Sequence, residues 1–486
     1  MNNLKLINIL RTFSKSEMKE FEKFISSPFF NRGRNYIPFF NQLKKFYPKF
    51  DNAKMTPEYV YSKIYPGKKY NKQILWNTTS SMLAMCEDFL MYVSLGRDKF
   101  ARERQVAEEF LERRLSVYYK KKLNEMESAL DNLGIGSAYF RQKAELEDGR
   151  MAYHFIEDTQ QFLPDLVDKK GNYVVLHFMR EISDIIGNMR TSKSMYNKQF
   201  DVSIPFQFVT NLKLDKIVEY AYSTKFKYAA VLDIYYETIM LSLEYDNEKH
   251  FFRLKELFEQ NHHLFTKEEK QLVAAELTNY CVQKMNEGDA SLRQSNFELD
   301  KFKLKQEIVL INRILPKVTF TQILGNALFL KEYEWAVKYI EEYAPKLKPS
   351  YQKPTKMLCY AHLYYLQKDY GKVLEYLSKV EFIDALDKIY VKTLYIRTYF
   401  EMKEFETLLS YLETTRHFYE KNPHVSNTLR SNNIKFISCM SRLLSAIESN
   451  DDFELEKIRK LVKSDNTIAN GQWIAEKIEK IKKGAN

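Results

Sequence analysis

The 486-residue sequence contains few residue combinations that support catalysis or metal binding. One Glu-x-x-His pattern joins Glu259 to His262, and His263 follows it directly. A two-metal carboxylate centre needs two such patterns and further glutamates, so a surface histidine pair after a charged helix is the simpler interpretation. The sequence has no GxxxxGK[ST] phosphate loop, no HExxH and no GxSxG. We therefore predict no catalytic residues, no metal site, no cofactor and no enzymatic activity.

Two glycines, Gly134 and Gly136, are spaced as in a dinucleotide-binding loop. That loop follows a strand and needs a third glycine, whereas this pair follows a helical pattern and lacks the third. Glycine suits the left-handed residue that ends many helices. We therefore predict a helix end at this point instead of a cofactor site.

The composition indicates a folded, all-α chain. Hydrophobic residues make up 45% of it, enough to bury a substantial core, and 13 Gly and 12 Pro are few for a sheet-rich protein. The four cysteines form no CxxC pair, so a reducing compartment is expected. No window approaches 18 apolar residues, and the N-terminus lacks an uninterrupted apolar signal core. We expect a cytoplasmic protein that does not interact with a membrane.

The positive charge is concentrated at the N-terminal end. Residues 1–80 contain 15 Lys and Arg against 5 Asp and Glu, which accounts for +10 of the net charge of +11. Such asymmetry favours an acidic partner, although a lysine-rich surface also serves solubility. One interpretation is a nucleic-acid-associated regulator that contacts phosphate through residues 1–95, with the later helices as a sensor or partner-binding domain. Its candidate contact residues are Arg32, Arg34, Lys44, Lys45, Lys68, Lys69 and Lys72.

Helical spacing of apolar residues continues along the chain and divides it into three predicted parts. Residues 1–96 form a basic N-terminal helical module, in which Ser14-Lys15-Ser16-Glu17 is a capping box that starts a helix. Residues 97–205 form amphipathic helical hairpins. Residues 206–486 form stacked hairpins closed by a capping helix over 473–481. The first four helices of this third part are predicted to form two hairpins. One joins residues 228–244 to 250–264, and the other joins residues 267–286 to 297–315.

Three short motifs recur in the last third of the sequence. They are Lys331-Glu332-Tyr333, Lys368-Asp369-Tyr370 and Lys403-Glu404-Phe405. The aromatic residues are 37 and then 35 residues apart, and each is followed six residues later by a tyrosine. Periods of this length are typical of stacked helical hairpins.

Residues 321–415 resemble tetratricopeptide repeats, a family of helix pairs about 34 residues long. Gly325 and Ala361 occupy the family's small-residue position in the first helix, and the three aromatic anchors open the second helix. The sequence departs from the pattern where Val373 and Leu408 replace the expected alanine and Ile396 replaces the small residue. The resemblance implies an all-α fold: a helical-hairpin solenoid that is similar to tetratricopeptide repeats and is preceded by the N-terminal helical module.

The resemblance also implies which residues line the concave face, because the first helices of successive pairs lie there. One row is polar (Asn326, His362 and Arg397) and the next is aromatic (Phe329, Tyr365 and Phe400). Such a surface suits a peptide, since polar groups orient it and rings supply contact area. Alternatively, the rings pack between repeats and the polar row meets water. We predict a non-enzymatic scaffold or adaptor that binds a peptide or protein segment along this face.

Overall fold

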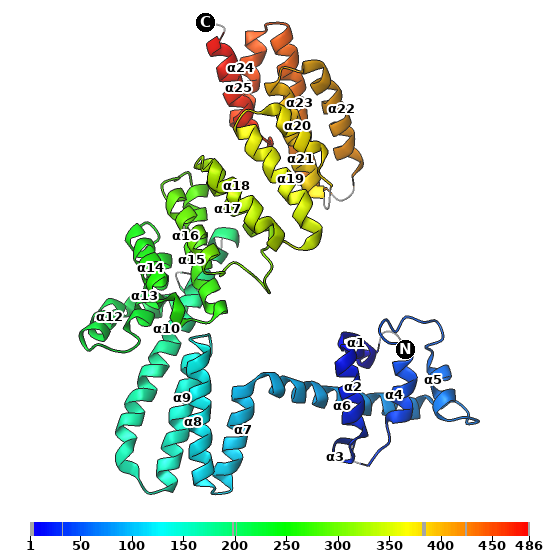
Figure 1. Ribbon diagram of the computed structural model, residues 1–486, viewed down its shortest axis with the longest axis vertical. Helices are drawn as coiled ribbons and strands as arrows, with labels where there is room; N and C mark the ends of the chain where they lie inside the picture. Colours follow the sequence, from blue (N-terminus) through cyan, green and yellow to red (C-terminus); the bar gives the residue numbers. More distant parts are fainter. Residues whose placement is uncertain are drawn as a thin grey trace. The chain divides into compact units, whose positions relative to one another are not determined.

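The computed structural model describes residues 4–31, 33–196, 199–200, 202–381, 385–422 and 425–484. Within these ranges the chain forms 25 α-helices, three short 3-10 helices and no β-strand (Figure 1). Helices pack mainly against their neighbours along the chain, as in a stack of hairpins. The prediction of an all-α solenoid of helical hairpins is therefore confirmed. No helix in the described part of the chain is both long and apolar enough to cross a membrane.

The chain divides into two compact units, Met1–Arg180 and Glu181–Asn486. The boundary falls inside a single helix, α10 (Leu163–Tyr196), and each unit is described below by itself. The division at residues 96 and 205 that the sequence suggested stays a prediction.

The N-terminal part of the first unit packs its helices around aromatic rings. The hydroxyl of Ser14 accepts a hydrogen bond from the backbone of Glu17, whose carboxylate accepts one in return, so the predicted capping box is confirmed. The rings of Phe13, Phe21 and Phe89 meet with centroids within 5.7 Å. The helices are α1 (Lys5–Thr12), α2 (Lys15–Ser26), α3 (Pro28–Asn31), α4 (Ile37–Lys44), α5 (Pro57–Ile64) and α6 (Lys72–Arg97).

The rest of the first unit consists of long amphipathic helices. Gly134 has a φ of +84° and ends α8, which confirms the predicted helix end. Buried Lys143 lies 3.1 Å from the carboxylate of Glu127 and 2.7 Å from that of Asp131, so ion pairs link α8 to α9. The elements are α7 (Lys99–Glu112), α8 (Ser116–Leu133), α9 (Tyr139–Ile156), η1 (Gln160–Phe162) and the first part of α10.

The second unit opens with hairpins at the predicted positions, with one correction. The helix predicted over 297–315 instead ends at Lys305, because Glu307 adopts a φ of +53° and turns the chain. An irregular connector over 306–316 follows, in which Ile311 and Ile314 exchange two backbone hydrogen bonds. The elements are α11 (Ile204–Asn211), α12 (Leu214–Ser223), α13 (Ala229–Leu243), α14 (Glu248–Asn261), η2 (His262–Leu264), α15 (Lys267–Asn286) and α16 (Arg293–Lys305).

The three recurring motifs form the turns inside three helix pairs. Lys331, Lys368 and Lys403 each have a φ near +60° (61°, 63° and 59°), and the acidic residue after each lysine donates its backbone N–H five residues back. This is the left-handed turn that commonly ends a helix. The pairs are α17 (Lys317–Phe329) with α18 (Tyr333–Tyr343), α19 (Pro349–Leu366) with α20 (Tyr370–Ser378), and α21 (Ala385–Glu401) with α22 (Phe405–Lys421); η3 (Ala344–Lys346) precedes α19.

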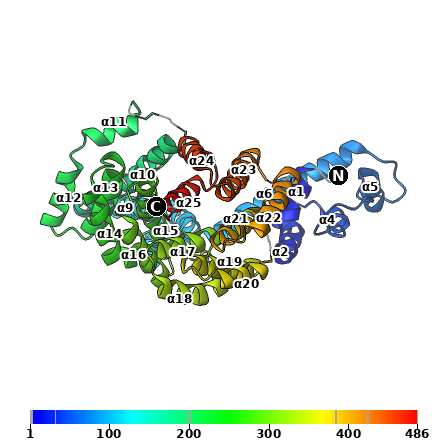
Figure 2. The ribbon, with the colours of Figure 1, turned by 90° about the horizontal axis from the view of Figure 1, so that it is seen from above.

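The second unit ends in α23 (Asn427–Glu448), α24 (Asp452–Ser464) and α25 (Gly471–Gly484), which lie side by side in both views (Figures 1 and 2). The predicted capping helix is therefore present, and it is a few residues longer than expected. Trp473, Ile474 and Ile478 are buried on its inner side, in one hydrophobic cluster with residues of α21 to α24. This burial fixes α25 against the end of the stack.

Candidate functional site

The six residues predicted to form a groove lie on the first helices of the three pairs. Asn326 and Phe329 lie on α17, His362 and Tyr365 on α19, and Arg397 and Phe400 on α21. The first helices α17 and α19 pack directly on each other, and α19 packs on α21. The surface that α15, α17, α19 and α21 share is called the first-helix face below. The six residues have different surroundings along it.

The far end of the first-helix face is covered by α25. The indole N–H of Trp473 donates to the hydroxyl of Tyr365 at 3.2 Å, and the Nε–H of Arg397 donates to the same oxygen at 3.3 Å. The Arg397 guanidinium lies 4.7 Å from the centre of the Tyr365 ring and 5.4 Å from the Trp473 ring. Phe400 meets Trp473 edge-on at 5.3 Å. Three of the predicted groove residues, Tyr365, Arg397 and Phe400, therefore contact Trp473 of the same chain.

An ion pair and burial strengthen this contact. Lys477, one turn after Trp473, pairs with Glu401 at the end of α21. Burial raises the pKa of Tyr365 to about 12, and its protonated hydroxyl donates to the Glu401 carboxylate at 3.3 Å while it accepts from Trp473 and Arg397. Tyr365 is 7% exposed and Phe400 8%. A ligand therefore reaches neither ring while α25 is docked.

His362 occupies the middle of the predicted polar row and is half-buried. Its Nδ1 lies 2.8 Å from the hydroxyl of Tyr390 on α21. Burial, with a smaller contribution from the Arg397 cation, lowers the pKa of His362 to about 4. The imidazole is thus neutral at pH 7 and serves the packing of α19 against α21.

Asn326 and Phe329 instead line an open cleft at the other end of the face. This cleft has a volume of about 650 Å³ and lies among α15, α16 and α17, within the size range of ligand pockets. The irregular connector over 306–316 forms part of its lining through Ile308, Val309, Ile311 and Pro316. The polar lining is rich in carboxamides, which belong to Gln271, Asn279, Asn286, Asn296, Gln322 and Asn326.

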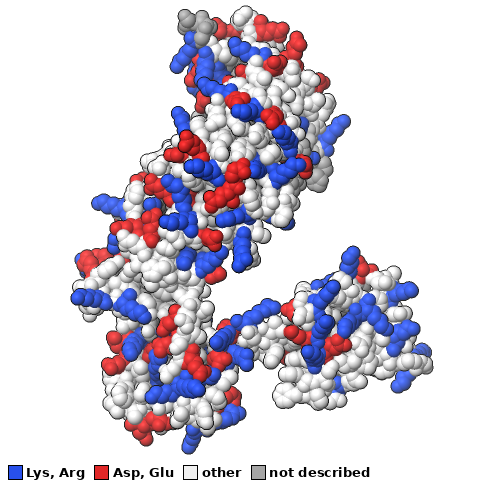
Figure 3. Space-filling view, in the orientation of Figure 1, with Lys and Arg blue, Asp and Glu red and all other residues white. Residues whose placement is uncertain are grey.

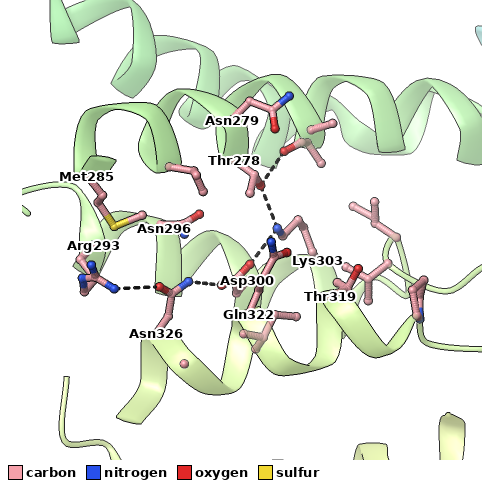
Figure 4. Close-up of a pocket in the computed structure, with 18 of the residues that line it drawn as sticks. Thr278, Asn279, Met285, Arg293, Asn296, Asp300, Lys303, Thr319, Gln322 and Asn326 are labelled. Carbon is pink, nitrogen blue, oxygen red and sulfur yellow. Dashed lines mark hydrogen bonds and ion pairs between the residues drawn. The ribbon is translucent and has the colours of Figure 1, made fainter. Parts of the chain in front are cut away.

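A row of hydrogen bonds crosses the cleft (Figure 4). Asn326 accepts from an Arg293 Nη1–H at 3.4 Å and donates to the Asp300 carboxylate at 2.9 Å. Asp300 pairs with Lys303 at 2.7 Å, and the Lys303 ammonium donates to the Thr278 hydroxyl at 2.9 Å. Asn326, Asp300 and Lys303 are buried. Their hydrogen bonds fix these side chains before any ligand arrives.

Two polar atoms at the cleft lack a partner among the residues that the structure describes. The Oδ1 of Asn296 and the Nε of Arg293 are both buried from solvent without a hydrogen bond. The guanidinium carbon of Arg293 lies 3.8 Å from the centre of the Phe329 ring, which is itself 61% exposed. In the described part of the chain no carboxylate pairs with Arg293. Unpaired buried polar atoms are costly, so these two mark where a ligand would bind.

The sequence prediction identified Asn326 and Phe329 but missed four of their neighbours. Asn296, Asp300 and Lys303 lie on α16, which precedes the recognisable repeats, and Arg293 begins the same helix. A signal was present in the spacing, since residues 296, 300 and 303 recur at i, i+4 and i+7 and so share one helix face. The same face also carries buried Phe297 and Leu304, so the three polar side chains are the exception on an apolar face.

The basic residues proposed as nucleic-acid contacts are spread over several elements of the first unit. Arg32 lies outside the described residues. The other six are exposed: Arg34, Lys44, Lys45, Lys68, Lys69 and Lys72. The ammonium of Lys44 pairs with Glu22 at 2.6 Å, and that of Lys68 lies over the Tyr65 ring. In Figure 3 the helices α1 to α6 carry mainly basic side chains on the face in view. Of these positions, Lys44 lines a surface pocket of about 610 Å³, together with Lys19, Glu22 and Lys23.

The Glu-x-x-His pattern also takes a structural role. The Nδ1 of His262 lies 3.0 Å from the backbone oxygen of Glu259, at the end of α14, and the ring packs edge-on against Phe302. In the described ranges no three His, Cys, Asp or Glu side chains are grouped so that they could hold a metal ion. Comparisons with family models, curated proteins and solved structures find no match. The resemblance to tetratricopeptide repeats therefore stays a prediction.

Proposed function

We propose that the protein is a non-enzymatic scaffold or adaptor that binds an extended peptide segment in the cleft among α15, α16 and α17. The observation that carries this proposal is the open, carboxamide-lined cleft next to Asn326 and Phe329. The other four predicted groove residues are engaged by neighbouring helices. The binding site is thus shorter than the sequence suggested.

Carboxamides suit a peptide main chain for a simple chemical reason. Each one presents a carbonyl acceptor beside an NH₂ donor, and a peptide unit presents the complementary N–H and C=O groups. Asn279 and Gln322 are exposed on opposite walls of the cleft, on α15 and α17. Apolar residues such as Ala274, Val282 and Ile323 also line the cleft and offer contact area. Specific orientation by few polar groups within an apolar lining is typical of ligand sites.

The experiment begins with a library of random 12-residue peptides displayed on phage and selected on the full-length protein. Selected peptides are synthesised, and their affinity is measured by titration calorimetry for the wild type and for the double variant Asn279→Ala/Gln322→Ala. The Gln367→Ala variant is the control, since Gln367 is an exposed amide of the same unit outside the cleft. In the described structure none of these three side chains makes a hydrogen bond, so the substitutions leave the fold intact.

Each lost hydrogen bond to the peptide costs about 0.5–1.5 kcal/mol. The double variant is therefore expected to bind roughly tenfold more weakly, and the control to bind like the wild type. If no peptide is enriched, or if all three proteins bind the peptides equally well, the cleft is not the peptide site.

The concentration of positive charge in residues 1–80 supports a second candidate, a nucleic-acid-associated regulator. Phosphate binding through exposed lysines predicts an affinity for DNA that falls steeply with added salt. Reversing the charge at Lys68 and Lys69 then weakens binding to every DNA sequence alike and reduces the salt dependence. A salt-independent or undetectable interaction with DNA excludes this candidate.

A further inference from the structure

The Arg293 end of the cleft has an excess of positive charge. The nearest carboxylate in the hydrogen-bonded row, Asp300, is already paired with Lys303 at 2.7 Å, and both side chains are buried. Arg293 has five N–H donors, one of which reaches Asn326 at 3.4 Å, while its Nε–H is buried without a partner. The described chain therefore leaves one guanidinium charge unneutralised at the cleft.

The local backbone adds to this positive potential. Arg293 is the first residue of α16, whose first turn contains no acidic side chain and whose N-cap, Leu292, makes no side-chain hydrogen bond. A helix N-terminus carries a partial positive charge. The positive charge of Arg293 adds to it, and no acidic side chain in the first turn of α16 compensates the two. Both features favour an anion at this end of the cleft.

The geometry of Arg293 limits what the anion can be. Its guanidinium carbon lies 3.8 Å from the centre of the Phe329 ring, a cation–π contact that holds the group at the cleft. The N–H groups of a guanidinium lie in one plane, and that fork matches the two oxygens of a carboxylate. Asn296 also lines the cleft and is 2% exposed, and its Oδ1 has no partner among the described side chains and backbone. This oxygen accepts a hydrogen bond and thus calls for an N–H donor on the same ligand.

We infer that Arg293 binds a carboxylate of the peptide segment and that Asn296 accepts a main-chain N–H of the same segment. This inference rests on the proposed function and adds the chemistry of the ligand to it. A carboxylate beside an amide N–H occurs both at a peptide C-terminus and at an Asp or Glu side chain. The two sources can be distinguished chemically, because a C-terminal amide removes only the first carboxylate and an Asn or Gln replacement removes only the second.

The test uses the selected peptides in matched forms. One form has its C-terminal carboxylate converted to an amide, and in others each Asp or Glu is replaced singly by Asn or Gln. Affinities are measured by fluorescence anisotropy with the full-length wild type, Arg293→Met and Arg293→Lys. Lys301→Met is the control variant, because Lys301 is an exposed cation over the Phe297 ring on the same helix outside the cleft.

Neutralising one particular carboxylate is expected to weaken wild-type binding tenfold or more, since a hydrogen bond to a charged group is lost. With Arg293→Met the same change has less than a twofold effect, because the partner is already gone. Arg293→Lys keeps the charge without the fork and retains part of the preference. Loss through the C-terminal amide assigns the C-terminus, and loss through a single Asn or Gln assigns that side chain.

The inference is overturned if every neutral form binds the wild type as tightly as its acidic parent, a comparison that needs no variant. It is also overturned if neutralisation has the same effect on the wild type and on Arg293→Met. Peptides that bind in the cleft without this charge dependence leave the proposed function standing and remove only the carboxylate contact. Absence of any peptide binding removes both.

Discussion

Replacement of Lys303 by methionine tests whether the polar row in the cleft is a buried, coupled network. Lys303 and Asp300 are i,i+3 neighbours joined at 2.7 Å, with side chains only 8% and 4% exposed. Removing one member of a buried pair leaves an uncompensated charge, which costs about 3–5 kcal/mol. Because Asp300 keeps its hydrogen bond from Asn326, we expect the lower end of this range, about 3 kcal/mol.

The assay is urea unfolding of the second unit, followed by tryptophan fluorescence, with the change in midpoint converted through the slope. Lys372→Met is a closely matched control, because Lys372 pairs with Asp369 at the same spacing and at 2.9 Å but with side chains 51% and 41% exposed. Such surface pairs contribute about 0–1 kcal/mol. Adding Asp300→Asn to Lys303→Met should recover part of the loss, since no buried charge then remains.

Equal, small effects of Lys303→Met and Lys372→Met, each below about 1 kcal/mol, would refute this reasoning. The same holds if Asp300→Asn makes the Lys303→Met protein still less stable. In either case the row across the cleft is solvated and does not hold the site in a fixed geometry before binding.

Three further outcomes are expected. Trp473→Ala should lower the unfolding free energy of the second unit by about 3 kcal/mol, because a buried ring and its partners are lost; an effect no larger than that of Phe453→Ala in the same unit, where the ring is 80% exposed, would show that α25 is not docked. The pKa of His362 is lowered to about 4 in the folded chain, against about 6.5 in the unfolded chain. Between these two pH values only the unfolded chain protonates this histidine, so the free energy of unfolding decreases as the pH falls through that window. From pH 7 to pH 5 the wild type should lose about 1–2 kcal/mol more than His362→Gln in urea unfolding, and parallel losses would contradict the lowered pKa. Lys368→Gly should increase the free energy of unfolding by about 0.5–1 kcal/mol, because glycine tolerates the φ of +63°; the thermal midpoint should rise accordingly. A lowered midpoint would indicate that the lysine side chain stabilises the turn.

The fold was largely predictable because the features that determine it are local. The capping box at Ser14, the glycine that ends α8 and the three lysine turns all act within a few residues, and their spacing is visible in the sequence. The prediction failed where the helix expected to continue to residue 315 ended at Lys305. That stretch keeps apolar residues at helical spacing, but the connector uses Ile308, Leu310 and Leu315 to pack its irregular backbone.

The candidate site was only partly predictable because it depends on contacts between distant residues. Spacing identified Tyr365 as a first-helix residue, but it gave no indication that Trp473, 108 positions later, covers it. Asn326 was placed correctly on its helix, whereas its partners Arg293 and Asp300 lie on a helix with no recognisable repeat motif. Helical periodicity shows which face a side chain shares with its neighbours, but it does not show what packs on that face.

Photo-crosslinking is the most direct test of where the peptide lies. A selected peptide carrying a diazirine group is bound to the full-length protein and irradiated, and the modified residues are mapped by mass spectrometry. We expect adducts on α15, α16, α17 and the connector, within residues 271–329. Adducts on α19, α21 and α25, or on residues 1–97, would contradict a binding site in this cleft.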